Sequence, residues 1–158
     1  MMVTRKLRYS EILSKLVHAG VASAQPVDSD VVDTSDLDTI EKRVERLMGI
    51  LHRKERDSTN MLFFVMYDIE SNKVRYQVAK YLIKKGCFRI QRSIFLADLD
   101  VQTYDKIKSD LAAVQACYDN HDSILIVPIS TDLLQSMKII GQNIDIDIIT
   151  KSKSTLFF

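Results

Sequence analysis

Asp68 is the residue of this sequence whose type and position best suit catalysis. It ends the apolar run FFVMYD, residues 63–68. A carboxylate at the end of a buried strand is held rigidly where the sheet meets solvent, and it can bind a divalent cation there. The same carboxylate could instead cap the turn into the helix expected at 73–85, although Ser71 and Asn72 lie nearer to that helix start. The residues alone leave both interpretations open.

A second chemical feature is the strongly basic segment at residues 73–92. It contains seven lysines and arginines and no acid, although the net charge of the whole chain is only +1. Such a segment predicts contact with phosphate groups. It has no interleaved aromatic platform of the kind that binds single strands by base stacking, so it favours the backbone of a duplex. The strongest candidates for this contact are Lys73, Arg75, Arg89 and Arg92, whereas Lys80, Lys84 and Lys85 fit the solvated face of a helix equally well.

Other catalytic motifs do not occur in the sequence. The three histidines and the two cysteines, Cys87 and Cys117, stand in no spacing typical of a metal site or a catalytic triad, and no nucleotide-binding glycine loop is found. The basic N-terminus lacks a continuous apolar stretch, and no apolar window reaches about 18 residues. We therefore expect reduced thiols in a cytoplasmic protein that does not enter the membrane.

The hydrophobic patterns predict a main domain over residues 61–158. A continuous apolar strand is expected at 61–69, a helix ending at Gly86, extended structure over 87–100 with an unplaced turn, a second helix at 104–118 and a strand at 123–130 in which Pro128 marks an edge or an end. A short helix at 131–138 and an alternating strand at 143–150 follow. This order predicts an α+β domain of the ferredoxin-like βαββαβ plan with an extra C-terminal strand.

Residues 1–60 predict a helical N-terminal extension that contains a linker. Apolar residues recur at helical spacing over 9–17 and again over 37–51, and the segment QPVDSDVVDTSD at 25–36 has the composition of a linker. We expect both helices to pack against the main domain or a dimer partner.

Several segments, in order, resemble the small CRISPR-associated endonuclease family (Cas-two), which accompanies the spacer integrase. They are VMYDI at 65–69, Lys73-Val74-Arg75 leading into VAKYL at 78–82, Gly86 before RIQRSIF at 89–95, DSILIVPI at 122–129, and Ile140-Gly141. Together these segments span most of the main domain, and the expected strands and helices follow one another in the matching order.

The resemblance implies a two-fold homodimer in which Asp68 of each copy approaches its mate. Two such carboxylates repel unless one is protonated or a cation lies between them, and Mg²⁺ is the expected cation. The pair would then bind one Mg²⁺ and cleave phosphodiester bonds. The resemblance also implies binding of duplex DNA and of the spacer integrase in CRISPR adaptation.

Four questions stay open from the sequence. The cleaved substrate is DNA or RNA, and the protein is an enzyme or a purely structural adaptor. An RNase toxin of a toxin–antitoxin pair would suit the same fold. The C-terminal residues Leu156, Phe157 and Phe158 either bind the integrase as a hydrophobic plug or dock in the protein's own core or dimer seam.

Overall fold

A four-stranded antiparallel sheet organises the protein. The computed structural model describes residues 8–22, 39–51, 59–117, 120–138, 140–141 and 144–145. The strand order is β2-β3-β1-β4, in which every neighbouring pair is antiparallel. The strands are β1 (Asn60–Asp68), β2 (Phe88–Gln91), β3 (Ile94–Asp100) and β4 (Ser123–Pro128). This mixture of helices and an antiparallel sheet confirms the predicted α+β class.

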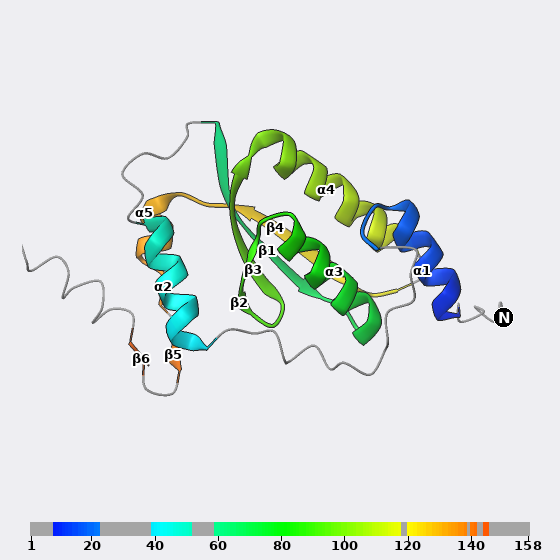
Figure 1. The fold of residues 1–158 in the computed structure, drawn as a ribbon, viewed down its shortest axis with the longest axis horizontal. Coiled ribbons are helices and arrows are strands. Elements are labelled where there is room, and N and C mark those ends of the chain that lie inside the picture. Colours follow the sequence, from blue (N-terminus) through cyan, green and yellow to red (C-terminus); the bar gives the residue numbers. More distant parts are fainter. Residues whose placement is uncertain are drawn as a thin grey trace, which may run out of the picture.

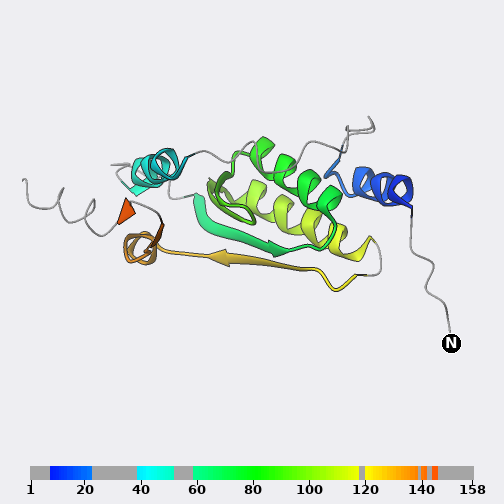
Figure 2. The same cartoon turned by 90° about the horizontal axis from the view of Figure 1, so that it is seen from below.

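Helices α3 (Asn72–Lys84) and α4 (Val101–Ala116) cover one face of the sheet (Figures 1 and 2). Because strand residues alternate between faces, Phe63, Val65 and Tyr67 of β1 all point into the core beneath these helices. Ser71 is the N-cap of α3, since its hydroxyl accepts a hydrogen bond from the Val74 N–H at 3.4 Å. The cap of this helix is therefore Ser71 and not Asp68.

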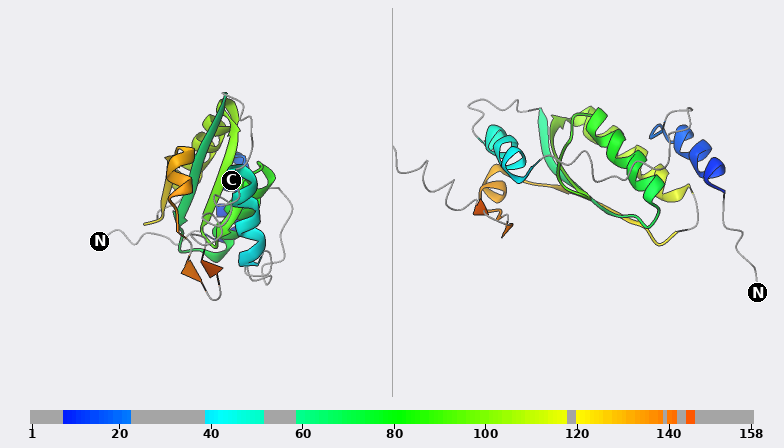
Figure 3. Two further views of the ribbon diagram at one scale, coloured as in Figure 1. Left: turned by 90° about the vertical axis from the view of Figure 1, so that its left-hand side faces the viewer. Right: turned by 60° about the horizontal axis from the view of Figure 1, so that its bottom comes forward.

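The opposite face of the sheet is covered near one end by α2 (Ile40–Leu51) and α5 (Thr131–Gln135). Figure 3 shows both helices at this end of the sheet, away from α1. The apolar side of α2 meets residues of β1, β2 and β3 that alternate with those of the first core. This second core contains Val44, Leu47, Met48, Ile50, Leu62, Ile90, Leu96 and Leu134.

The first helix of the extension, α1 (Tyr9–His18), belongs to the core under α3 and α4. Leu16 is fully buried there, and Lys15 donates from Nζ to the Cys117 carbonyl at 2.7 Å. Both expected helices of the extension thus pack against the main domain. The predicted linker at 25–36 lies outside the described residues.

A buried polar network joins α3 to α4. The Tyr81 hydroxyl donates to Asp110 Oδ2 at 2.6 Å, and Lys106 Nζ approaches Asp110 Oδ1 at 2.6 Å. Gly20, which follows α1 with a φ of +80°, lies against the same carboxylate. Asp110 is therefore shared by α3, α4 and the end of α1.

Two sequence predictions at the C-terminal end have different outcomes. The strand at 123–130 is an edge strand that ends at Pro128, as its proline indicated. The described part of the strand expected at 143–150 is only β6 (Ile144–Asp145), which pairs with β5 (Ile140–Gly141) in a separate two-stranded sheet. None of the described helices is both long enough and apolar enough to cross a bilayer.

Candidate functional site

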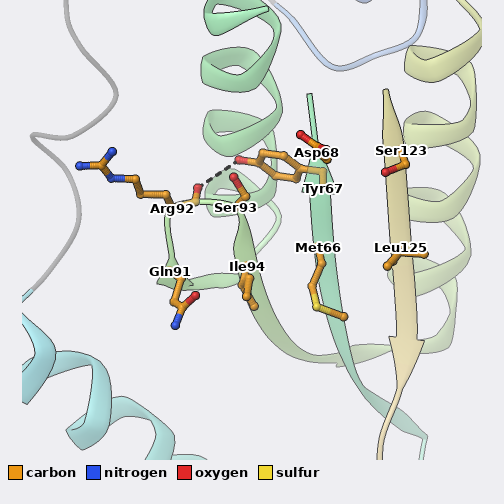
Figure 4. Close-up of a pocket in the computed structure, with 9 residues that line it drawn as sticks. All are labelled: Met66, Tyr67, Asp68, Gln91, Arg92, Ser93, Ile94, Ser123 and Leu125. Carbon is orange, nitrogen blue, oxygen red and sulfur yellow. Dashed lines mark hydrogen bonds between the residues drawn. The ribbon is translucent and has the colours of Figure 1, made fainter. Parts of the chain in front are cut away.

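A cavity of about 440 Å³ lies where β1 ends, beside the β2–β3 turn and the start of β4 (Figure 4). Three antiparallel strands bring these segments together, because β1 pairs with β3 on one side and with β4 on the other. The residues of its wall that can do chemistry are Asp68, Arg92, Ser93 and Ser123, and Met66 and Leu125 line its apolar part.

Asp68 is exposed at the end of β1, directly opposite Ser123 of β4. Its neighbour Tyr67 points to the other face and is 7% exposed. The Tyr67 ring stacks on Phe95 with centroids 6.1 Å apart, and its hydroxyl donates to the Arg92 carbonyl at 3.5 Å. Tyr67 therefore packs and donates a hydrogen bond, while Asp68 is the acidic side chain that reaches the cavity.

The β2–β3 turn, Arg92-Ser93, is held by side chains. Arg89 is only 6% exposed, and its guanidinium lies 5.6 Å from the centre of the Phe95 ring. It donates to the Arg92 carbonyl from Nε at 3.0 Å and again from Nη2. The Ser93 carbonyl in turn accepts a hydrogen bond from the Tyr67 N–H at 3.1 Å. The turn is thus tied both to β2 and to the strand that carries Asp68.

The four basic candidates occupy different environments. Lys73 is exposed in the first turn of α3, with Nζ 4.2 Å from the centre of the Tyr9 ring. Arg75 is half-buried and donates to the Ile69 carbonyl at 3.2 Å. Arg92 is exposed, and Figure 4 shows its side chain extending away from Asp68. Arg89 alone of the four is buried, and its guanidinium donates hydrogen bonds to the β2–β3 turn.

Asp122, which directly precedes the cavity residue Ser123, is a residue that the sequence analysis did not single out. Its Oδ1 accepts a hydrogen bond from the Glu70 N–H at 3.0 Å, which ties the loop after β1 to the start of β4. Its place at the start of the segment DSILIVPI, before a strand that pairs with β1, is the signal that could have found it.

The metal ligands of the site were also a sequence prediction. Among the described residues, no cluster of three or more His, Cys, Asp or Glu side chains is arranged to hold a metal ion. The C-terminal residues Leu156, Phe157 and Phe158, proposed for partner binding, lie outside the described residues.

Comparison with known proteins places the site in a family. None of the curated proteins that were searched matches the chain. Residues 61–137 match the model of a family described as CRISPR associated protein Cas2. The match begins in β1, ends just after α5 and includes the whole cavity wall described above, while α1 and α2 precede it. Residues 61–137, just under half of the chain, are therefore similar to the CRISPR associated protein Cas2 family.

Proposed function

We propose that this protein is a homodimeric adaptor of CRISPR adaptation that binds duplex DNA and carries a Mg²⁺-dependent phosphodiesterase activity centred on Asp68. The observation that supports it most directly is the exposed Asp68 carboxylate at the end of β1, in a cavity shared with a basic turn. The match of residues 61–137 to the Cas2 family supports the adaptation role. The dimer, the metal, the cleavage and the partners are our proposals.

The sheet order agrees with the ferredoxin-like plan. In that plan two strand–helix–strand units interlock, so that the two strands of the first unit, one before and one after its helix, are separated by a strand of the second unit. Here β3 lies between β1 and β2, and the strand order β2-β3-β1-β4 follows from this. We assign the residues from β1 to β4 to this plan. The plan itself hosts many activities, so the function rests on the site.

The proposed dimer uses the face of the sheet that α2 and α5 leave accessible. On this face Leu125 of β4 is 58% exposed and Val127 is 37% exposed, while Met66 beside them is half-buried. Exposed apolar residues gathered on a sheet face favour contact with another protein surface. A two-fold axis through this face covers the same residues in both copies and brings the two Asp68 side chains toward each other.

The residues that line this site would have different roles in metal binding and phosphate binding. Asp68 from each copy provides carboxylate oxygen, and one or two such groups suffice for Mg²⁺, which keeps several of its waters. When bound, the cation would neutralise phosphate charge and lower the pKa of a bound water. The hydroxyls of Ser93 and Ser123 line the same cavity and can hydrogen-bond phosphate oxygens.

Lys73, Arg75 and Arg92 are the residues that we assign to the DNA backbone. Lys73 and Arg92 are exposed, and Arg75 is half-buried beside the loop after β1. Each phosphate that they neutralise steepens the fall of the logarithm of affinity with the logarithm of salt concentration by about 0.9. Arg89 was predicted for the same role, but its guanidinium is buried against Phe95 and the turn. The integrase remains the proposed partner of Leu156, Phe157 and Phe158.

The test compares wild type with Asp68→Asn, which keeps the size of the side chain and removes the charge. We expect the variant to lose Mg²⁺-dependent cleavage of duplex DNA by more than tenfold while it keeps its dimer and its DNA affinity. Asp105→Asn is the matched control, since Asp105 is an exposed carboxylate of α4. Spacer acquisition in cells that carry the integrase is measured for all three proteins.

The outcomes separate the competing functions. Loss of cleavage and of acquisition in Asp68→Asn alone supports the proposal. Normal acquisition without cleavage would mean that the protein acts as a structural adaptor. Cleavage of RNA in place of DNA, with acquisition unchanged by deletion of the gene, would instead favour an RNase toxin.

A further inference from the structure

Helix α2 contacts strand β2, next to the site, through Arg43. Arg43 Nη1 donates to the carbonyl of Ile90 in β2 at 2.5 Å. Its Nε is buried and has no hydrogen-bond partner among the described residues. Because α2 precedes the residues that match the Cas2 family, this contact belongs to the extension of the present chain.

The carbonyl that Arg43 binds lies at an irregularity of the sheet. Arg89 pairs with Phe95 and Gln91 pairs with Ile94, and the register shifts between them. The register therefore leaves Ile90 without a partner residue on β3. The extra residue of a bulge is left unpaired and bends its strand, so that its backbone needs support from outside the ladder. Arg43 provides that support.

Two arginines thus hold the end of β2 from both sides of Gln91. Arg43 binds the Ile90 carbonyl before it, and Arg89 binds the Arg92 carbonyl after it. The turn beyond them places Ser93 in the cavity wall, and its carbonyl accepts the hydrogen bond of the Tyr67 N–H next to Asp68. These contacts form a continuous path from α2 through the β2–β3 turn to the end of β1, where Asp68 lies.

Helix α2 is itself well anchored. Val44, Leu47, Met48 and Ile50 are all buried and pack on the sheet. Close packing makes such a helix a rigid support. The guanidinium of Arg43 is therefore carried on a fixed element, in contrast to an exposed side chain on a loop.

We propose that α2 is a positioning element of the Asp68 site: Arg43, together with Arg89, fixes the bulge of β2 and thereby the Arg92-Ser93 turn. The inference rests on the proposed function for what the site does, but the positioning itself is a property of the free protein. It gives the N-terminal extension a role in DNA binding and cleavage although α2 does not line the cavity.

Hydrogen exchange of the Tyr67 amide tests the positioning without DNA or metal, because this amide is bonded to the Ser93 carbonyl. In Arg43→Met, which keeps the apolar stem and removes the donors, we expect exchange about tenfold faster than in wild type through local opening. Arg43→Lys, which can still donate, should restore most of the protection. Lys42→Met, at the exposed neighbouring position of α2, should exchange as wild type does.

Amides in the middle of α4, such as that of Leu111, are measured in the same experiment. Their unchanged exchange would exclude a loss of global stability as the cause. Equal protection of the Tyr67 amide in wild type and Arg43→Met would overturn the proposal, and so would an equal loss in Lys42→Met.

A double-mutant cycle with duplex DNA tests the consequence for binding. Arg43→Met is expected to weaken binding about fivefold, the factor that corresponds to one lost hydrogen bond. If Arg43 acts through the turn, Arg43→Met adds little in an Arg92→Gln background, because the positioned charge is already gone. Additive effects would mean that Arg43 contacts DNA directly and would overturn the positioning role. Absence of DNA binding in wild type would contradict the proposed function. The hydrogen-exchange experiment would still test the positioning role of α2.

Discussion

At the scale of single residues, burial decides what a reactive side chain can do. Cys87 is 4% exposed, and burial raises the pKa of its thiol to about 12. Burial also raises the pKa of Cys117, although Lys15 opposes the shift. Because the thiolate is the reactive form, both cysteines are suited to packing and not to nucleophilic chemistry.

The raised pKa of Cys87 predicts a loss of stability at alkaline pH. Below pH 9, the ordinary value for a thiol, both the folded and the unfolded chain keep the proton. Between about pH 9 and 12 the unfolded chain releases it and the folded chain does not, so the free energy of unfolding falls as pH rises. Urea denaturation at pH 8, 10 and 11 should therefore show the advantage of wild type over Cys87→Ala shrinking with pH. An advantage independent of pH would contradict this assignment.

At the scale of elements, α1 is part of the domain although it lies far from it in the sequence. Leu16 is fully buried in the core with Val74, Val78 and Leu111. We predict that Leu16→Ala lowers the free energy of unfolding by about 2–5 kcal/mol, the range for removing a buried leucine side chain. The same substitution at the half-buried Leu13 should cost clearly less. Chemical denaturation of the full chain measures both, and equal losses would mean that α1 is not docked as described.

The sequence predicted the strands and helices well where a strong period or a cap is present. The apolar run of β1, the stripes of α3 and α4, and the stop at Gly86, whose φ is +95°, all correspond to observed elements. The β2–β3 turn could not be placed, because RIQRSIF contains no glycine or asparagine of the kind that marks a two-residue turn. Side-chain donors from Arg89 and Tyr67 hold it instead, and such contacts leave no local signal.

The candidate site was predictable only in part, because the sequence shows local features but not burial or contacts between distant residues. Asp68 stands out because a charge follows a buried strand, and this depends only on neighbouring residues. Arg89 was grouped with the phosphate-binding residues because its charge is visible in the sequence and its burial is not. The contact of Arg43 with Ile90 joins residues 47 positions apart and could be found only from the fold.

At the scale of the whole molecule, the two faces of the sheet differ in how fully they are covered. Leu125 is 58% exposed on the face proposed for the dimer, and Ile83 is 48% exposed on α3, on the other side of the sheet. We predict that Leu125→Asp weakens self-association by at least about tenfold, because a desolvated charge opposes burial. Ile83→Asp should leave association unchanged. Sedimentation at several concentrations distinguishes the two, and equal effects would place the contact elsewhere.

The distribution of the extension over both faces of the sheet also bears on how the chain is made. Leu16 and Leu47 leave the ribosome first, yet the strands that cover them follow, and Leu134 of the second core comes last. At ordinary rates of translation this delay is on the order of ten seconds. Throughout that interval two amphipathic helices present uncovered apolar surfaces. The nascent protein should therefore be a client of ribosome-associated chaperones, and a version that starts at β1 should depend on them less.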